Sequence, residues 1–392
     1  MNITAAEAVS RLKVNRATLY AYVSRGLIRA EADPRDSRKR LYLAEDVDRL
    51  AVRKARGRAP TKVAAATLDW GLPVLDSAIT LIDGVRLFYR GHDAVHLATT
   101  TGLEDCARLL WDCGATDPFE PAMPPAPSRW QALTRDLRDA GTVERVQVLL
   151  PLMAESGLAS WRREPSRLWP AAARLMRHVA AAATASAPSV APIHRHLAEA
   201  WGQPQAAEAI RTALVLCADH ELNASTFTVR VVASTGAALG NCVLAGLAAL
   251  SGPRHGGQTA QVEVLFDEFE QLGDATKAVE ARLARGDRLP GFSHPLYPDG
   301  DPRARAILAL LPPERSRDGL FTAAERIGGW LPNLDVATVA LRRAMSLPRG
   351  AAMTIFAVGR TAGWIAHAFE QAADGKLIRP RARYVGPAPA TG

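Results

Sequence analysis

The architecture of this chain is indicated by residues 231–257, which read VVASTGAALGNCVLAGLAALSGPRHGG. Positions 231–250 carry no charge and are rich in glycine and alanine, whose small side chains let helices pack closely. Ser234, Thr235 and Asn241 dilute the apolar character, and the sequence holds no second span of this kind, so a membrane helix is rejected. The stretch predicts a fully buried helix, or a broken pair of helices, at the centre of the fold or of a dimer interface.

The same stretch ends in GPRHGG, residues 252–257, which carries a single imidazole. Pro253 cannot continue a helix interior, and Gly256 and Gly257 permit tight backbone geometry. We therefore expect His255 on a turn, with both ring nitrogens available for chemistry. A lone histidine is more often a satisfied structural residue than a catalyst, so this interpretation depends on partners elsewhere in the chain.

Length and composition are those of an ordinary globular protein. The 392 residues suffice for two or three domains, and 48% of them are hydrophobic and 22% charged. Alanine is abundant and aromatic residues are few, which favours helix over sheet. No basic segment followed by an apolar one opens the chain, so we expect no secretory signal and a cytoplasmic location. The cysteines, expected to be reduced and mostly buried, have no metal-ligand spacing: Cys106, Cys113, Cys217 and Cys242.

The positive charge is concentrated at the N-terminus. The whole chain has a formal net charge of +8, and residues 1–60 alone hold 14 Lys and Arg against 7 Asp and Glu. The rest of the chain is almost neutral. This asymmetry indicates an acidic partner for the N-terminal residues only.

Residues 1–52 have the pattern of a small helical domain with a wing. A first helix begins after Thr4, which forms a capping box with Glu7. A second helix is predicted over 17–25, with Asn15 as its cap. A hairpin-like wing, DPRDSRKRLYL (33–43), and a helix starting near residue 44 follow.

Two short helices joined by a tight turn follow the plan of a DNA-binding helix-turn-helix. The segment resembles the winged helix-turn-helix of the MerR type; the alternative is a basic helical cap used only for oligomerisation. Side chains on the second helix and the wing are of types that reach phosphates and base edges. The candidate DNA contacts are Arg16, Thr18, Tyr20, Arg25, Arg38, Lys39 and Arg40. A basic linker, residues 53–65, comes next.

The remainder of the chain predicts a mainly α-helical fold. LPVLDSAITLIDGVRLFYRGHD (72–93) indicates a short β-hairpin with Asp83-Gly84 as its turn, and 103–114 predicts an amphipathic helix ended by Gly114. Neither β-α alternation nor a glycine-rich phosphate loop is present. Further helices are predicted over 129–138, 142–155, 165–183, 190–202 and 204–218.

Polar side chains gather at the breaks between the later helices. His220 lies in ADHELNASTFTVR (218–230), His294 and Arg303 in GFSHPLYPDGDPRARAIL (291–308), Asp335 in PNLD (332–335), and Arg360 in FAVGRTAGWIAHAFEQ (356–371). Each has an ordinary structural interpretation, and helix capping is the default one for Asp335. Arg360 is harder to dismiss, because a buried arginine must find an anion. Together these residues predict a carboxylate-binding site with acid and base groups.

The motifs that carry these residues resemble those of the citrate synthase family. They are DHELNASTFTVRVVAST, GPRHGG, GFSHPLYPDGDPRA, PNLD, FAVGRTAGWIAHAFEQ and RPRARYVG (379–386), in the family's order, and the resemblance covers about residues 66–386. It implies a mainly helical homodimer with a large domain (66–257 and 346–392) and a small, hinged domain (258–345). No cofactor is permanently bound in this family, and acetyl-CoA and oxaloacetate are its substrates.

The resemblance also implies residue roles. Asp335 matches the base that takes a proton from the acetyl-CoA methyl group. His255 matches the donor to the enolate oxygen, and His294 the group that polarises the oxaloacetate carbonyl. His220, Arg303 and Arg360 match ligands of the dicarboxylate. Arg379 matches an arginine that reaches the neighbouring subunit's site.

Two turns depart from the family pattern. The family continues the first as HGGAN, where this chain has Gln258 and Thr259, and it has a basic residue after the Tyr297 position, where this chain has Pro298-Asp299. Both changes bear on acyl-CoA binding. The expected activity is citrate (Si)-synthase-type condensation. The alternatives are a 2-methylcitrate synthase using propionyl-CoA, or a transcriptional regulator that uses the synthase body as a ligand sensor.

Overall fold

The chain folds into two compact units, Met1–Asp76 and Ser77–Gly392, each with its own hydrophobic cluster. The computed structural model describes residues 2–12, 14, 16–24, 27–33, 36–48, 50, 75–120, 122–124, 126–153, 165–382 and 384–387. The predicted cap Asn15, Arg25 and the basic linker 53–65 lie outside these residues.

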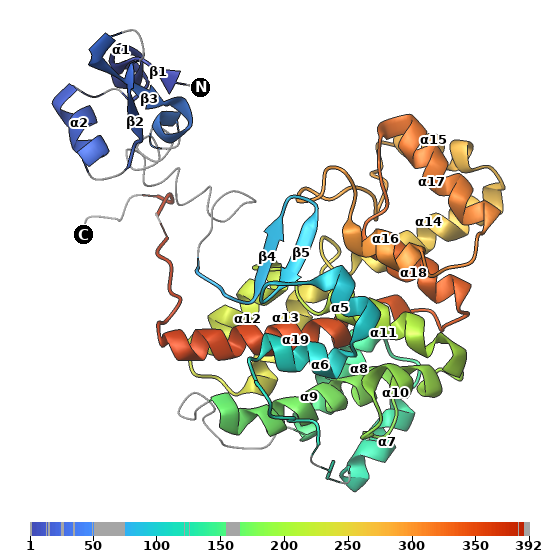
Figure 1. Ribbon diagram of the computed structural model, residues 1–392. Coiled ribbons are helices and arrows are strands. Elements are labelled where there is room, and N and C mark those ends of the chain that lie inside the picture. Colours follow the sequence, from blue (N-terminus) through green and yellow to red (C-terminus); the bar gives the residue numbers. More distant parts are fainter. Residues whose placement is uncertain are drawn as a thin grey trace. The chain divides into compact units, whose positions relative to one another are not determined.

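In its described residues the N-terminal unit combines short helices with a three-stranded antiparallel sheet, and residues 44–48 are helical, where a helix was predicted to start. Its elements are β1 (Asn2–Ile3), α1 (Ala5–Leu12), α2 (Arg16–Ser24), β2 (Ala30–Asp33) and β3 (Asp36–Leu43), with sheet order β1-β3-β2 (Figure 1). The predicted capping box is confirmed, since Thr4 Oγ1 accepts from Glu7 N at 3.3 Å and Thr4 N donates to Glu7 Oε2 at 2.7 Å. Leu12, Leu19 and Tyr42 are buried in its small core.

The second unit opens with a small antiparallel sheet, β4 (Thr80–Asp83), β5 (Arg86–Tyr89) and β6 (His92–Asp93), in the order β4-β5-β6. Asp83 pairs with Arg86, so the hairpin turn is Gly84-Val85, one residue later than predicted. Gly84 has a φ of +58°, a conformation that glycine adopts without strain. The sheet is tied to the helical body because Thr80 Oγ1 donates to Asp219 Oδ2 at 2.5 Å.

Helices make up the rest of this unit, as predicted. They are α5 (Ala94–Thr100), α6 (Leu103–Leu110), α7 (Ser128–Asp136), α8 (Thr142–Met153), α9 (Pro165–Thr184), α10 (Ile193–Ala200), the 3₁₀ helix η2 (Pro204–Ala206), α11 (Ala207–Cys217), α12 (Ala224–Ser234), α13 (Leu239–Leu250), α14 (Gln258–Leu272), α15 (Ala275–Ala284), α16 (Pro302–Leu308), α17 (Arg315–Gly328), α18 (Leu334–Ala344) and α19 (Ala351–Asp374). α6 ends at Leu110 rather than near Gly114, because the chain turns at Trp111 and Asp112.

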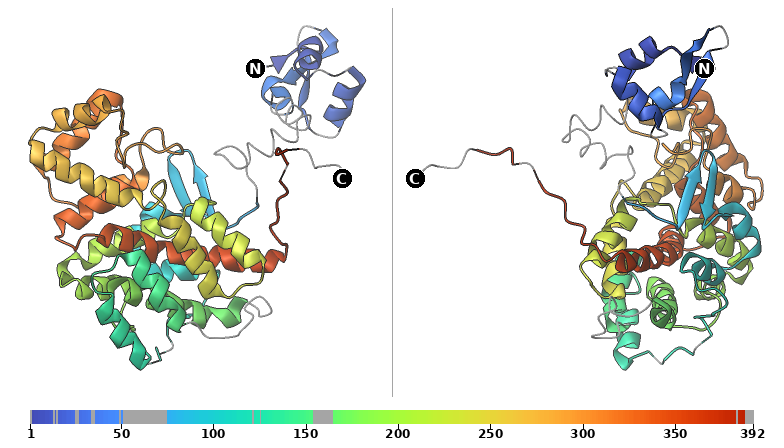
Figure 2. Two further views of the ribbon diagram at one scale, coloured as in Figure 1. Left: turned by 180° about the vertical axis from the view of Figure 1, so that it is seen from behind. Right: turned by 60° about the vertical axis from the view of Figure 1, so that its left-hand side comes forward.

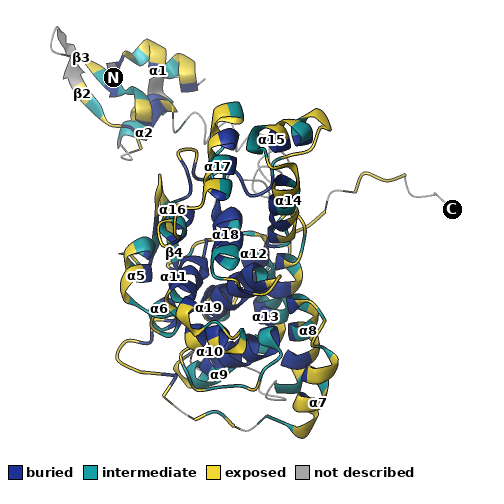
Figure 3. Ribbon diagram, turned by 90° about the vertical axis from the view of Figure 1, so that its right-hand side faces the viewer, coloured by how far each residue is buried: buried dark blue, intermediate teal, exposed yellow. Residues whose placement is uncertain are grey.

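Helix α19 is the central element of the body. It is 24 residues long, is buried along most of its length and packs against α9, α11, α12, α13 and α18 (Figures 1 and 3). Gly359 and Gly363 make the contact with α11 close: a Cβ at 359 would lie 2.7 Å from the carbonyl oxygen of Leu214. Small residues at these two positions therefore let α19 and α11 approach each other.

The uncharged stretch 231–250 forms a broken pair of helices. α12 ends at Ser234, and α13 begins at Leu239 after Gly236, whose φ is +81°. Of the two predicted alternatives, the single fully buried helix is wrong. Asn241 and Ala248 are exposed, because α13 buries only one face.

The five helices α14 to α18 gather together on one side of the body (Figures 1 and 2). Of the remaining helices of the unit, α6, α9, α11, α12 and α13 pack directly against α19. Among the described helices none is long and apolar enough to cross a membrane. All four cysteines are free and buried, as predicted.

Candidate active site

Six of the seven predicted site residues come together where α11, α12, α16, α18 and α19 meet. His220 lies between the end of α11 and the start of α12, and its ring packs edge-on against His294 with centroids 5.2 Å apart. Its Nε2 hydrogen-bonds the Tyr297 hydroxyl at 3.0 Å. Burial, followed by the Arg303 charge, lowers the pKa of His220 well below its ordinary value, so the ring is neutral at physiological pH.

The His255 ring is held by a side chain of α12, Ser225. Its Nε2 lies 2.9 Å from Ser225 Oγ. Ser225 Oγ also lies 2.7 Å from Asn223 Oδ1, which only accepts, and 3.2 Å from Trp364 Nε1, which only donates. The serine proton therefore points to Asn223, and His255 Nε2 carries its own proton. Burial and then Arg360 lower the pKa of His255 to about 4.

His294 is fixed in the tautomer that carries its proton on Nε2. Its Nδ1 accepts a hydrogen bond from the Leu296 backbone N–H at 3.2 Å. Burial and then the Arg303 charge lower the pKa of His294 to about 4. At neutral pH the ring is thus an uncharged donor through Nε2.

Arg303 and Asp301 form a buried pair at the start of α16. Arg303 Nε donates to Asp301 Oδ1 at 2.9 Å and Nη2 to Oδ2 at 2.7 Å. Asp301 also caps α16, since Oδ1 accepts from Arg303 N. Although burial alone would favour the neutral acid, Arg303 holds the pKa of Asp301 below its ordinary value. The pair orients the guanidinium, which stacks on the Tyr297 ring at 5.4 Å.

Arg360 is the cation of this site that lacks a carboxylate partner within hydrogen-bond reach in the described residues. It is 1% exposed, and Nε donates to the Cys217 carbonyl oxygen at 2.7 Å. Its guanidinium lies 5.1 Å from the Phe356 ring, which also contacts His255. The predicted anion is present only at longer range, as Asp219. A buried cation in this state favours binding of an anionic ligand.

Asp335 lies in the first turn of α18. The ordinary structural interpretation of this residue, helix capping, does not hold, because the N-cap is Asn333, whose Oδ1 accepts from Asp335 N at 2.9 Å. The Asp335 side chain is therefore not needed to cap α18. Its Oδ1 is buried and has no hydrogen-bond partner among the described residues. Burial, opposed by Arg303, raises the pKa of the Asp335 carboxyl to about 7.

Arg379 does not lie close to the other six predicted site residues. It is exposed in the segment that follows α19, and no contact with the cluster is formed within the described part of the chain. Three further residues belong to the site geometry and were missed: Ser225 and Tyr297 as hydrogen-bond partners of His255 and His220, and Trp364 as a donor to Ser225 Oγ. Sequence spacing carried no signal for them, because each partner is distant in the chain or on another element.

The two departing turns have structural roles. Thr259 is buried, and its Oγ1 donates to the Gly256 carbonyl oxygen at 2.9 Å. Gln258 N donates to the His255 carbonyl oxygen at 2.9 Å, so both residues stabilise the turn that carries His255. Tyr297 is buried under His220 and His294.

The predicted DNA contacts are only partly described. Tyr20 on α2 is 53% exposed, and Arg40 on β3 is exposed. Thr18 is partly buried and has an interaction partner. The backbones of Arg16, Arg38 and Lys39 lie in α2 and β3, but their side chains, like all of Arg25, lie outside the described residues.

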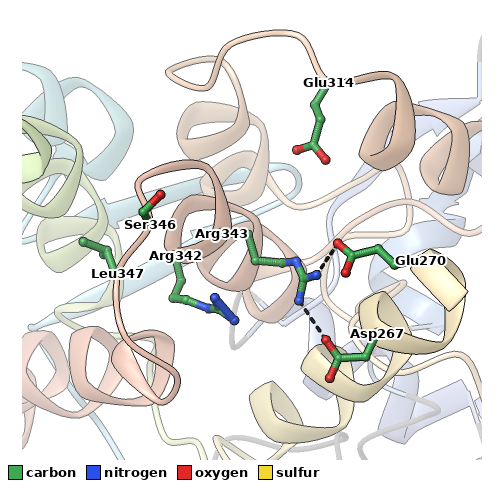
Figure 4. Close-up of a pocket in the computed structure, with 7 residues that line it drawn as sticks. All are labelled: Asp267, Glu270, Glu314, Arg342, Arg343, Ser346 and Leu347. Atoms are coloured by element: carbon green, nitrogen blue, oxygen red, sulfur yellow. Dashed lines mark hydrogen bonds and ion pairs between the residues drawn. The ribbon is translucent and has the colours of Figure 1, made fainter.

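A surface pocket of about 620 Å³ lies outside this cluster, beside α14, α17 and the end of α18 (Figure 4). In it Arg343 is paired with Asp267 and Glu270. Arg342 donates to Glu263 at 2.7 and 2.9 Å. Because its arginines are already neutralised by carboxylates, this pocket fixes α18 against α14 and offers little to an anionic substrate.

Comparison with known proteins places these residues in a family. A sequence model described as "Citrate synthase, C-terminal domain" matches residues 67–381. Citrate synthase 2 of Bacillus subtilis is 34% identical over 197 residues, 47% of this chain and 52% of that protein. The 2-methylcitrate synthase of Shewanella oneidensis is 33% identical over 186 residues, 45% of this chain and 50% of that protein. The chain thus spans about half the length of the curated relatives it matches.

The fold is shared with solved structures. The crystal structure of citrate synthase from Thermotoga maritima superposes with a TM-score of 0.67 at 24% identity, covering 82% of this chain and 96% of that one. The predicted mainly helical fold is therefore confirmed.

Proposed function

Because the chain belongs to the citrate synthase family, we propose that it is a citrate (Si)-synthase-type acyltransferase that condenses acetyl-CoA with oxaloacetate. The products are citrate and CoA, and no bound cofactor takes part. The observation that carries the proposal is the state of Asp335, whose pKa is raised to about 7 and whose Oδ1 has no hydrogen-bond partner among the described residues, beside neutral histidines and buried arginines.

The first step is removal of a proton from the acetyl-CoA methyl group by Asp335. Burial makes this carboxylate a stronger base than an exposed one. The C–H electron pair forms the enolate, whose oxygen accepts a hydrogen bond from His255. Since Nε2 is bound to Ser225, donation through Nδ1 requires the Ser225 hydroxyl to turn from Asn223 towards His255 Nε2. One rotation of that hydroxyl then accompanies the change of tautomer.

The second reactant, oxaloacetate, is a dianion. Two arginines and two histidines surround the binding site that we propose for it. Arg360 and Arg303, with His220, bind the carboxylates, and bidentate contact from Arg360 orients the ketone. His294 donates from Nε2 to the ketone oxygen. The enolate carbon bonds to the ketone carbon, the ketone oxygen takes up a proton, and water then hydrolyses the thioester to release CoA. Closure of a small domain (258–345) over a large one (66–257 and 346–392) excludes water until the carbon–carbon bond has formed.

Purified protein given oxaloacetate and acetyl-CoA tests this proposal through the release of free thiol. Propionyl-CoA is assayed in parallel, because one methylene changes pocket contacts by only about 1–3 kcal/mol. A preference for propionyl-CoA would assign the chain to the 2-methylcitrate synthase reaction of its Shewanella relative. No thiol release with either substrate would contradict the enzyme proposal and favour a ligand sensor.

A second function, DNA binding, is favoured by the N-terminal unit. We propose a MerR-like helix-turn-helix over residues 1–52, because α1 and α2 precede an antiparallel β2–β3 hairpin and the first sixty residues carry most of the net charge. Its contacts are those predicted above, from Arg16 to Arg40. A gel shift with the protein's own promoter DNA, with and without residues 1–60, tests it. Unchanged binding after truncation would contradict this assignment.

We further propose a cytoplasmic homodimer in which Arg379 reaches the site of the neighbouring subunit. Arg379 is exposed in the segment after α19, as such a role requires. The four free thiols suit a reducing compartment. Light scattering of the purified chain measures its oligomeric state.

A further inference from the structure

Asn333 joins the two segments that carry His294 and Asp335. Its side chain is buried, and its Oδ1 caps α18 by accepting from Asp335 N at 2.9 Å. Its Nδ2 donates to the Ser293 carbonyl oxygen at 3.3 Å, and its backbone N donates to the Gly291 carbonyl oxygen at 2.9 Å. One amide side chain thus holds the residue before His294 and the start of the helix that presents Asp335.

The conformation of the segment before His294 depends on the hydrogen bond between Asn333 and Ser293. Phe292 forms an isolated antiparallel bridge with Pro332, and Ser293 N donates to the Leu331 carbonyl oxygen at 2.7 Å. Ser293 has a φ of +64°, a left-handed conformation that is unfavourable for a non-glycine residue. Hydrogen bonds on both sides of Ser293, one of them from Asn333, hold it in that conformation.

We propose that Asn333 is a positioning residue that sets the distance between the His294 and Asp335 side chains. The inference rests on the proposed function, in which these two groups act on the two reacting carbon centres. A cap alone would need only an oxygen at position 333, and aspartate, serine and asparagine are all good N-caps. Asparagine adds a side-chain donor to the capping oxygen. This donor, Nδ2, bonds the Ser293 carbonyl oxygen.

Two substitutions separate the hydrogen bond to Ser293 from the capping of α18. Asn333→Ser keeps a capping oxygen and removes the bridging donor. Asn333→Asp keeps the cap but sets a carboxylate oxygen against the Ser293 carbonyl, and it adds a negative charge beside Asp335. The charged groups that already act on Asp335 are Arg303 and Asp301 at the start of α16, and its carboxyl also acts on the Cys217 thiol of α11.

The steady-state kinetics of thiol release test the inference. Both variants are expected to lose kcat by about tenfold or more, because sub-ångström misplacement of reacting groups is costly. The KM for oxaloacetate stays within about twofold, since its arginine ligands lie on other elements. In Asn333→Asp the acid limb of the kcat profile also moves to higher pH, whereas in Asn333→Ser it stays in place. Wild-type kcat and pH profile in Asn333→Asp would overturn the inference.

Asp274→Asn is the matched control for capping. Asp274 caps α15 by accepting from Lys277 N at 3.1 Å, away from the six clustered residues. This exchange is expected to leave kcat, KM and the pH profile unchanged. An equal loss of kcat in the control would overturn a specific role of Asn333.

Thermodynamic linkage separates this inference from the proposed function. Because the folded pKa of Asp335 is raised from 3.8 to about 7, its carboxyl costs stability progressively as pH rises between those values and no further above about 7. The difference in unfolding free energy between wild type and Asp335→Asn should therefore level off above pH 7. In the Asn333→Asp background it should continue to change at higher pH. Levelling at the same pH in both backgrounds would contradict the placement of the 333 side chain beside the Asp335 carboxyl, on which the inference rests, even in a protein that releases no thiol.

Discussion

Asp335 is the side chain on which the pH dependence of the proposed reaction rests. Its pKa is raised to about 7, whereas those of His255 and His294 are lowered to about 4. One ionisation therefore governs the range between pH 5 and 8, and the active form is the carboxylate. We expect kcat/KM to fall about tenfold for each pH unit below 7 and to be level above it. Thiol-release kinetics from pH 5 to 9 measure this profile.

Asp335→Asn should remove the base without disturbing the fold. We expect a loss of roughly 10²- to 10⁴-fold in kcat. Burial penalises the ionised carboxylate, so at pH 8 the amide variant should be at least as stable as wild type. Retention of most of the activity, or an acid limb that persists in this variant, would show that another group is the base.

Ser225 sets the tautomer of His255, and its removal should affect catalysis rather than binding. In Ser225→Ala the His255 Nε2 proton loses its acceptor, and no hydroxyl is left to reverse the hydrogen bond. We expect kcat to fall about ten- to a hundredfold with oxaloacetate KM nearly unchanged. Thr228→Ala is the control, since Thr228 lies on the same helix and its hydroxyl donates to the Ala224 carbonyl oxygen at 2.8 Å. Equal kinetics of the two variants would contradict a role for Ser225.

The identity of the polar side chains could be predicted from sequence, but their hydrogen bonds could not. His220 and Arg360 stand out because they occur at a helix break and in an apolar helix. Their partners, Tyr297 and the Cys217 carbonyl, lie 77 and 143 residues away in the chain. The default capping interpretation of Asp335 fails for the same reason that Asn333 was missed as the cap: two residue types that cap helices stand two positions apart, and local rules choose poorly between them.

The contact between α11 and α19 delivers Arg360 to the site, and two glycines make it possible. A Cβ at Gly359 would lie 2.7 Å from the Leu214 carbonyl oxygen and 2.8 Å from Cys217 Cβ. Gly359→Ala should push the helices apart, lower stability by about 1–3 kcal/mol and raise the KM for oxaloacetate. Urea unfolding and steady-state kinetics measure the two effects.

Gly319→Ala is the matched exchange in another helix. Position 319 lies inside α17, and a Cβ there would meet only Ala275 Cβ, at 4.0 Å. Alanine has the higher helix propensity, so this variant should be stabilised by up to about 1 kcal/mol with unchanged kinetics. If both exchanges behaved alike, the close approach of α19 would not depend on Gly359.

Helices were easier to predict than their ends. Periodic segments such as 142–155 and 165–183 match α8 and α9 within a few residues. For 231–250 two alternatives were predicted, and the broken pair is the one that forms, because Gly236, with a φ of +81°, lies between α12 and α13. The hairpin at 80–89 was found, but its turn was placed one residue early, because the cross-strand register is decided by packing and not by the Asp-Gly pair alone.

Most of the net positive charge of the chain lies in one of its two structural units. The unit Met1–Asp76 has its own small core, and the six clustered site residues all belong to Ser77–Gly392. The charge asymmetry along the sequence predicts an acidic partner for the N-terminal residues only. The identity of the basic unit's partner does not follow from its fold alone, since fold and function are separable.

Salt dependence gives the sharpest test of whether that partner is DNA. Phosphate contacts release counterions, so log K for full-length protein should fall linearly with log salt, and residues 1–60 should account for the whole slope. Arg40→Ala, at an exposed position of β3, should lower the magnitude of the slope by about one, whereas Arg195→Ala, exposed on α10 in the other unit, should not. Fluorescence anisotropy between 50 and 200 mM salt measures both. Removal of residues 1–60 should abolish the binding yet leave thiol release intact, because every clustered site residue remains. A slope that survives the truncation would move the nucleic-acid contact to the synthase body, and a loss of thiol release would mean that the two units act as one.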